Sequence, residues 1–116
     1  MKKDPLIFIM HIRDSIQDIE NYTKDISKDS FVKNKMLQDA VIRKIEIIGE
    51  AVKNLPKDFT KKYPNIQWDD IAGMRDKLIH HYFGVDMELA YDVVKNDLPK
   101  LKKEIKKILE NAEKRK

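Results

Sequence analysis

The chain has 116 residues, of which 41% are apolar and 38% charged, with a formal net charge of +4 and no cysteine. This length suits a single domain, which we expect to span residues 1–116. The lack of cysteine excludes a disulfide framework, a thiolate metal site and a cysteine nucleophile. The longest apolar run, Leu6–Met10, is too short to cross a bilayer, and the N-terminus lacks the pattern of a signal peptide. We therefore expect a soluble, cytoplasmic protein.

The composition favours an all-α fold. Helix-forming residues dominate, and only 3 glycines and 4 prolines are available for turns. The positive charge is concentrated near the end, because residues 95–116 carry nine Lys/Arg against four Asp/Glu. Such a stripe can attract nucleic-acid phosphates, although a solvated lysine-rich helix face is the more common explanation.

The first predicted helix begins near Asp4, with Pro5 at the first helical position, where its missing N–H costs nothing. Its apolar stripe recurs at helical spacing and consists of Ile9, Ile12, Ile16 and Ile19. After a polar connection over residues 23–29, Asp29 or Ser30 is expected to cap the second helix.

The second helix is predicted to run to about Leu55, where Pro56 stops it. It has a wide apolar arc made of two stripes: Leu37, Val41, Ile45, Ile48, Val52 and Leu55, and beside them Met36, Ala40, Ile47 and Ala51. A helix with so wide an arc must be covered on more than one side, so it should form the centre of a bundle and can leave a face for a partner chain. Gly49, which costs about 1 kcal/mol of helix propensity, predicts close approach of another helix. Arg43, Glu46 and Glu50 interrupt the arc, and we interpret them as structural rather than catalytic.

A short helical turn is expected over residues 57–63, followed by a helix from Trp68 to Gly84 whose buried stripe comprises Ile71, Met74, Leu78 and Tyr82. Asp86 should cap the last helix, which Pro99 should kink or restart. The predicted fold is thus an up-and-down bundle of four to five helices with a long central second helix.

Residues 73–82 gather the side chains best suited to phosphate and proton chemistry. Arg75 offers a planar fork of donors that stays charged, which suits a phosphodiester or its transition state. His80 titrates near neutral pH and can accept or donate a proton, while Asp76 can orient either residue. These groups suffice for RNA cleavage by attack of the ribose 2′-OH on the adjacent phosphate, and we expect neither a metal ion nor a cofactor.

Helix geometry raises a difficulty for this pair. On an ideal helix, Arg75 and His80 would lie roughly 140° apart around the axis and about 7.5 Å apart along it. They could meet if the helix frays, if Arg75 reaches around the edge, or if a symmetric dimer brings one chain's arginine toward the other chain's histidine.

The spacing Arg75-x4-His80-x-Tyr82 resembles the signature of the HEPN superfamily, specifically the HepT-type toxins that are paired with an MNT-type nucleotidyltransferase antitoxin. The segment Ile48-Gly49-Glu50-Ala51 resembles the family's Gly-Glu-Ala segment, and Trp68 to Asp76 resembles the approach to its active site. Val85-Asp86 and Leu98-Pro99 fit its final part, so the resemblance covers nearly the whole chain.

This resemblance implies a dimeric helical bundle, with the motifs of two protomers near a shared cleft, that cleaves RNA without a metal ion and arrests growth when unchecked. It makes Arg75 and His80 the catalytic pair, with Asp76 as the polar residue after the arginine. It also makes Tyr82 the acceptor of AMP units from the partner nucleotidyltransferase. A negatively charged group beside the phosphate-binding cleft should repel RNA. His81 lies outside the motif, and we interpret it as a bystander.

Two other interpretations stay open. The wide apolar arc of the second helix and the unfavourable Arg75–His80 spacing fit a non-catalytic dimeric subunit that binds a nucleotidyltransferase and a nucleotide or RNA. A purely structural bundle would instead bury Arg75 and His80 with backbone partners.

Overall fold

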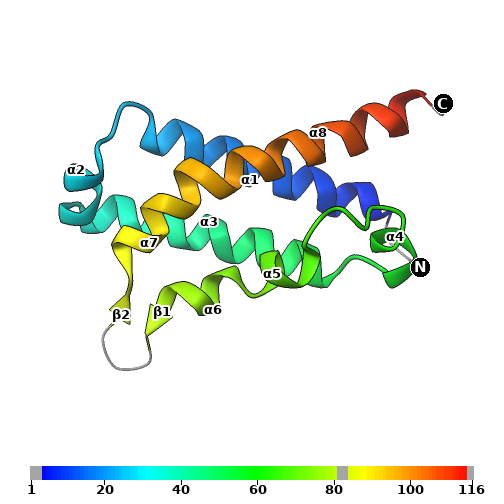
Figure 1. The fold of residues 1–116 in the computed structure, drawn as a ribbon. Helices are drawn as coiled ribbons and strands as arrows, with labels where there is room; N and C mark the ends of the chain where they lie inside the picture. Colours follow the sequence, from blue (N-terminus) through cyan, green and yellow to red (C-terminus); the bar gives the residue numbers. More distant parts are fainter. Residues whose placement is uncertain (1–3, 81–83, 115–116) are drawn as a thin grey trace.

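The computed structural model describes residues 4–80 and 84–114, without the side chains of residues 80, 84 and 85. Within these ranges the regular structure is helical, apart from two short β-strands of two residues each that pair with one another (Figure 1). In chain order the elements are α1 (Pro5–Thr23), α2 (Lys28–Lys33), α3 (Lys35–Lys53), α4 (Lys57–Thr60), α5 (Trp68–Ala72), α6 (Met74–Leu78), β1 (Ile79–His80), β2 (Gly84–Val85), α7 (Met87–Asp92), the π-helical turn η1 (Val93–Asp97) and α8 (Leu98–Lys114).

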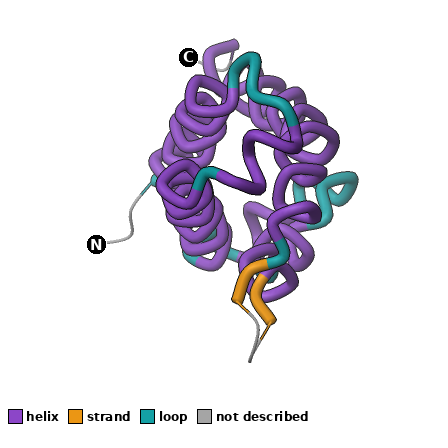
Figure 2. The backbone as a smooth tube through the Cα atoms, turned by 90° about the vertical axis from the view of Figure 1, so that its left-hand side faces the viewer, coloured by secondary structure: helices purple, strands orange, loops and turns teal. Residues whose placement is uncertain are grey.

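The long elements form an up-and-down bundle, as the sequence predicts. Successive segments of the chain run in opposite directions along the molecule: first α1, then α3, then α5 with α6, and last α7 through α8 (Figure 1). Viewed from the end, the helices surround a common interior (Figure 2). Helix α3 packs against α1, α5 and α6, and is therefore the central helix that its wide apolar arc predicts. Within the described ranges, no helix combines the length and apolarity needed to cross a membrane.

Local capping explains where several helices begin. The Asp4 carboxylate accepts from the Leu6 N–H, and Pro5 occupies the first turn of α1, as predicted. The Asp86 carboxylate accepts from the Leu89 N–H at 3.1 Å and caps α7, which is also predicted. These caps depend on short stretches of sequence, which is why sequence alone finds them.

The second predicted helix is two helices, and the expectation of one continuous helix from Asp29 or Ser30 is wrong. Ser27 caps α2 by accepting from the Ser30 N–H, and Asn34 then leaves helical geometry. The Asn34 side chain accepts from the Leu37 N–H at 3.0 Å and starts α3. Asparagine competes well for such a capping role, so the chain turns a corner there and buries Phe31 completely.

Gly49 lies at a close approach between α3 and α5, as its position predicts. A Cβ atom built on Gly49 would lie 3.1 Å from the Ala72 carbonyl oxygen. Glycine lets the α5 backbone come this close to α3 without displacing the Ala72 carbonyl group. This contact fixes where α6 begins and therefore where Arg75 stands.

The expected helix from Trp68 to Gly84 is the main error of the sequence interpretation. It breaks at Gly73, and α6 ends at Leu78 because Ile79 has extended backbone angles of φ −102° and ψ 121°. Strand β1 then pairs antiparallel with β2, with His80 opposite Gly84, and the Asp86 N–H bonds to the Leu78 carbonyl at 2.7 Å. Gly84 is thus a strand residue, and the predicted place of Tyr82 on the buried stripe falls outside the described residues.

The predicted irregularity near Pro99 takes the form of the π-helical turn η1. The Leu98 N–H bonds to the Val93 carbonyl, one residue further back than in an α-helix. Proline has no N–H to give to the carbonyl of Lys95, and its ring would clash with that carbonyl in a regular α-helix. The wider turn relieves this conflict, so α8 starts anew at Leu98.

Candidate functional site

Arg75 lies in the first turn of α6, immediately after the break at Gly73. Its side chain is 44% exposed, which excludes the interpretation in which backbone partners bury it. Asp76 is more exposed still, at 79% of its side-chain surface. Both residues therefore stand where a molecule from solvent can reach them.

Glu46 of α3 is the closest charged partner of Arg75. The Arg75 Nε lies 2.5 Å from the Glu46 Oε2 atom. The Asp76 Oδ1 atom lies 3.6 Å from the Arg75 Nη1, which is an ion pair but too long for a hydrogen bond. Glu46 thus holds the guanidinium group by its Nε atom, while 44% of the Arg75 side-chain surface stays exposed to solvent.

These side chains line a polar cleft of about 310 Å³ between α3 and the α5–α6 segment. Gly49 and Ala72 contribute to its lining at the point where the two backbones meet. Its charged residues are three bases and three acids, and the full lining is Arg43, Glu46, Gly49, Glu50, Lys53, Ala72, Arg75 and Asp76. The formal charges of the lining cancel, so the cleft offers directed donors rather than a positive field.

His80 follows in β1, two residues beyond the end of α6. Because α6 stops at Leu78, the separation of 140° on an ideal helix does not apply to Arg75 and His80. The structure therefore removes the geometric objection that the sequence raises. The His80 side chain, His81 and Tyr82 lie outside what the structure describes.

From the sequence, Glu46 is interpreted as structural, and nothing in the sequence connects it with Arg75. The two residues are far apart in the sequence and meet only because α5 and α6 fold back on α3. A signal was available, since Arg43, Glu46 and Glu50 interrupt an otherwise apolar arc. Charged residues on a half-buried helix face predict a polar partner, but not which one.

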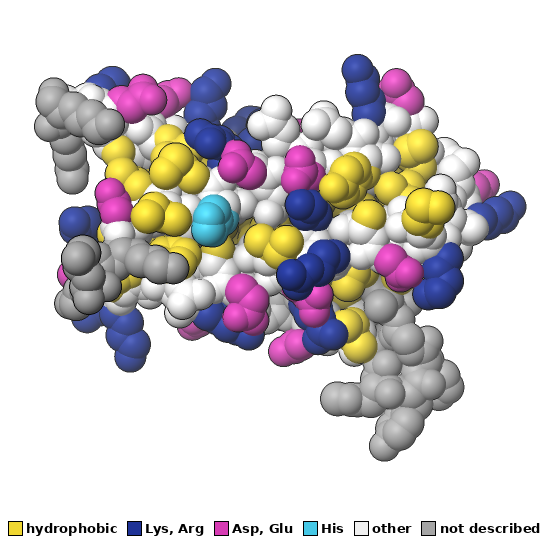
Figure 3. Space-filling model, turned by 180° about the vertical axis from the view of Figure 1, so that it is seen from behind, with side chains coloured by type: hydrophobic (Ala, Val, Ile, Leu, Met, Phe, Trp, Pro, Cys, Tyr) yellow, Lys and Arg dark blue, Asp and Glu magenta, His cyan; other side chains and the backbone are white. Residues whose placement is uncertain are grey.

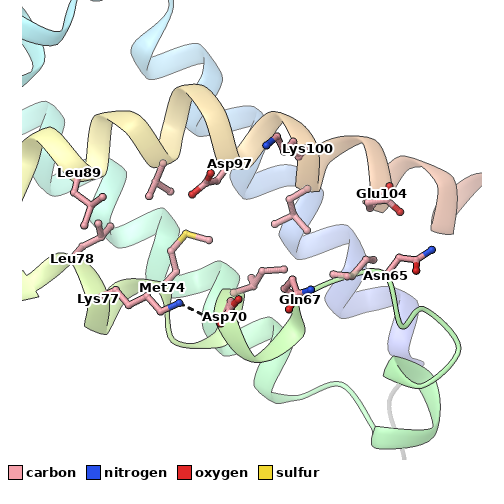
Figure 4. Close-up of a pocket in the computed structure, with 14 residues that line it drawn as sticks. Asn65, Gln67, Asp70, Met74, Lys77, Leu78, Leu89, Asp97, Lys100 and Glu104 are labelled. Atoms are coloured by element: carbon pink, nitrogen blue, oxygen red, sulfur yellow. Dashed lines mark hydrogen bonds and ion pairs between the residues drawn. The ribbon is translucent and has the colours of Figure 1, made fainter.

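A second hollow is chemically different (Figure 4). It is a groove of about 510 Å³ between the α5–α6 segment and the run from α7 to α8, with an apolar floor. Met74 and Leu78 face Leu89 across it, and Lys77 pairs with Asp70 at 3.3 Å on its rim (Figure 4). This groove suits an apolar surface better than a phosphate.

Three lysines of the basic C-terminal segment have polar partners in the described part of the chain. Lys102 pairs with Glu20 at 2.9 Å, Lys107 pairs with Glu104 at 3.4 Å, and Lys95 donates to the Thr23 carbonyl. The face seen in Figure 3, on the side of the molecule away from α8, carries interspersed basic, acidic and apolar side chains. The Arg75 cleft is the better candidate for phosphate chemistry, because the planar forks of its two arginines match phosphate oxygens.

Comparison with known proteins gives one consistent family. The family profile described as Ribonuclease HepT-like matches residues 12–108. A protein of Thermococcus cleftensis named "Probable ribonuclease HepT" is 45% identical over 108 residues, covering 93% of this chain and 98% of that protein.

Two relatives from Methanocaldococcus jannaschii are also similar. One, named "Putative RNase", is 49% identical over 112 residues, covering 97% of this chain and 93% of its own length. The other, named "Gamma-glutamylcyclotransferase and putative RNase", is 58% identical over all 116 residues, but the chain spans only 52% of that protein's length. No solved structure matches the chain significantly.

Proposed function

Because this chain belongs to the Ribonuclease HepT-like family, we propose that it is a metal-independent endoribonuclease that acts on RNA in the cytoplasm. The observation that carries the proposal is the exposed Arg75, held at the mouth of a cleft by Glu46 and followed in the chain by the strand that bears His80. The sequence relatives named as ribonucleases support the choice of RNA as the substrate.

The reaction proceeds by attack of the ribose 2′-oxygen on the adjacent phosphorus, while the bond to the 5′-oxygen breaks. The 2′-hydroxyl proton passes to water, and protonated His80 gives its proton to the leaving 5′-oxygen. Arg75 balances the negative charge that grows on the phosphate oxygens in the transition state. Asp76 helps to orient Arg75, with which it forms an ion pair. The products are a 2′,3′-cyclic phosphate and a 5′-hydroxyl.

We place this activity in a toxin–antitoxin pair, following the Arg75-x4-His80-x-Tyr82 spacing. In this proposal the chain is a homodimer and the toxin, and a cognate MNT-type nucleotidyltransferase is its antitoxin. The antitoxin transfers AMP from ATP to the Tyr82 hydroxyl, forming a phosphodiester with release of pyrophosphate. The added phosphate repels the RNA phosphate at the neighbouring cleft and so inhibits cleavage.

Purified protein incubated with RNA in excess EDTA tests the proposed activity. Wild type should cleave, and His80→Ala should cleave at least about 100-fold more slowly, since general acid catalysis contributes that much. His11→Ala is the matched control, because His11 lies on the exposed face of α1 and should have no effect. Absence of cleavage by wild type, or equal cleavage by His80→Ala, would contradict the proposal.

The alternative function is a non-catalytic dimeric helical subunit that binds a nucleotidyltransferase partner and a nucleotide or RNA. The apolar groove beside α6 favours it, because an apolar helix of that partner can cover Met74, Leu78 and Leu89. Expression of the chain alone separates the two functions in cells. It should arrest growth if the chain is a ribonuclease toxin, and should be harmless if it is only a binding subunit.

A further inference from the structure

Glu46 lies between two arginines and contacts both with different oxygens. Its Oε2 atom pairs with the Arg75 Nε at 2.5 Å, and its Oε1 atom lies 3.6 Å from the Arg43 Nη1. Arg43 and Glu46 stand one turn apart on α3, whereas Arg75 comes from α6. The carboxylate therefore gathers two guanidinium groups from two elements at one cleft.

The exposure of these residues argues against a role in stability alone. The Arg43 and Arg75 side chains are 69% and 44% exposed, and the Glu46 side chain is 31% exposed. Ion pairs this open to solvent add little to folding, because water screens them and the side chains lose entropy. Both arginine side chains stay partly exposed to solvent, and the planar fork of arginine matches the oxygens of a phosphate.

The balance of charges in the cleft indicates different roles for Glu46 and for the two arginines. A cleft lined by as many acids as bases does not attract RNA through net charge, so phosphate binding must come from donors aimed at it. Glu46 aims them, but its own negative charge opposes a phosphate that comes close. Removing that charge should help binding while it releases the arginines from their positions.

We propose that Arg43 is a second phosphate-binding residue beside Arg75, and that Glu46 is the positioning residue that holds the two guanidinium groups as one clamp on the RNA backbone. This proposal rests on the proposed function for its substrate. It adds Arg43 and Glu46, which the Arg75-x4-His80-x-Tyr82 spacing does not include. Arg43 touches the substrate, whereas Glu46 acts only through the arginines.

Binding of a fluorescent 2′-O-methyl RNA oligonucleotide tests the clamp even if the protein cleaves nothing, since this strand lacks the attacking hydroxyl. Arg43→Ala should weaken binding by roughly tenfold. It should also reduce the slope of log binding constant against log salt concentration by about one, the value expected for the loss of one phosphate contact. Arg13→Ala is the matched control, because Arg13 is 49% exposed and pairs with the acid next to it but lies on α1. Equal affinities of Arg43→Ala and Arg13→Ala would overturn the assignment of Arg43.

Steady-state cleavage of unmodified RNA tests the role of Glu46. Glu46→Gln should lower kcat by about tenfold or more, because Arg75 is no longer held, while KM stays equal or falls with the loss of a negative charge. A merely structural carboxylate would not split kcat from KM in this way. Glu20→Gln, which removes an exposed acid that pairs with Lys102, serves as the control.

The outcomes separate the two proposals. If wild type cleaves RNA and Glu46→Gln matches it in kcat, the positioning role is wrong and the ribonuclease proposal stands. If wild type binds the 2′-O-methyl strand through Arg43 but cleaves no RNA, the clamp stands and the ribonuclease proposal fails.

Discussion

At the scale of single residues, the site depends on how one exposed arginine is held. Arg75 has enough freedom to meet a ligand and a short ion pair with Glu46 that limits its orientations. A preorganised donor stabilises a developing charge without having to move at the moment of reaction. This combination of access and restraint is what separates Arg75 from an ordinary surface arginine.

Replacing Arg75 should therefore affect activity far more than stability. Arg75→Ala is expected to lower kcat by about 10²–10³-fold, the loss typical for removal of one transition-state donor. The free energy of unfolding should change by less than about 1 kcal/mol, because the ion pair is largely exposed. Cleavage rates together with urea denaturation measure both effects. An inactive variant that is also unfolded would contradict this account.

Arg75→Lys separates charge from geometry at the same position. Lysine keeps the positive charge but lacks the planar fork, so most of the activity should still be lost. Recovery of near wild-type kcat in Arg75→Lys would mean that charge alone is sufficient and that the orientation by Glu46 has no catalytic value.

The residue scale also shows what sequence can and cannot predict. The caps Asp4 and Asp86 were predictable because each acts on an N–H two or three residues away. The choice of Arg75 and Asp76 came from residue chemistry and the family resemblance. The contact of Glu46 with Arg75 was not predictable, because it depends on how α5 and α6 fold back on α3.

At the scale of elements, short breaks in the helices determine the shape of the site. The breaks at Asn34 and Gly73 and the end of α6 at Leu78 all fell inside segments whose apolar spacing predicted continuous helices. Helical periodicity persists across such breaks, since the flanking residues still face the same core. The β1–β2 pairing adds a tertiary constraint that overrides local helix propensity.

The contact at Gly49 gives a test at this scale. Gly49→Ala should improve helix propensity by about 1 kcal/mol, but its Cβ would lie 3.1 Å from the Ala72 carbonyl oxygen. A backbone atom cannot move aside as a flexible side chain can, so overpacking should win and the protein should lose about 1 kcal/mol of stability. Activity should fall as well, because Gly49 and Ala72 line the cleft that contains Arg75.

Gly73→Ala provides the control for Gly49→Ala. Its Cβ would meet the Asp69 carbonyl oxygen at 3.5 Å, an ordinary contact, and the residue has a φ of −95° that any amino acid can adopt. Thermal unfolding should show Gly73→Ala within about 0.5 kcal/mol of wild type. Equal stability of the two variants would mean that α5 does not press closely on α3.

The pair between Lys44 and Asp18 joins α3 to α1 and gives a pH dependence. Its hydrogen bond, with the Lys44 Nζ 2.8 Å from the Asp18 Oδ2, raises the pKa of Lys44 above its ordinary value of 10.5. A raised pKa in the folded state stabilises the protein fully below 10.5, and this stabilisation is lost as the pH rises through the folded-state pKa. The stability difference between wild type and Lys44→Met should be constant from pH 7 to 9 and shrink above pH 10.5. A difference that stays constant above that pH would show that the charge of Lys44 is not involved.

At the scale of the whole molecule, the bundle separates two kinds of surface. The polar Arg75 cleft lies between α3 and the α5–α6 segment, and the apolar groove lies between that segment and the run from α7 to α8. The all-α bundle was predictable because periodicity and composition agree over the entire chain. The presence of a polar cleft and a separate apolar groove was not predictable from the sequence, since it depends on where the α5–α6 segment lies relative to α3 and α8.

The proposed switch at Tyr82 makes a prediction for the assembled system. Tyr82→Phe should keep RNA cleavage but resist inhibition when the cognate nucleotidyltransferase and ATP are added, because it lacks the acceptor oxygen. Mass spectrometry should find AMP on wild type and not on Tyr82→Phe. Modification of both proteins at another residue would contradict the assignment of Tyr82.

The most direct test of the central claim is the chemistry of the cleaved ends in EDTA. Wild type should convert an RNA oligonucleotide into fragments with 2′,3′-cyclic phosphate and 5′-hydroxyl ends, as mass spectrometry can identify. A 2′-O-methyl strand of the same sequence should stay intact, and Arg75→Ala and His80→Ala should give few fragments. Cleavage of the 2′-O-methyl strand, or unchanged cleavage by either variant, would contradict the account.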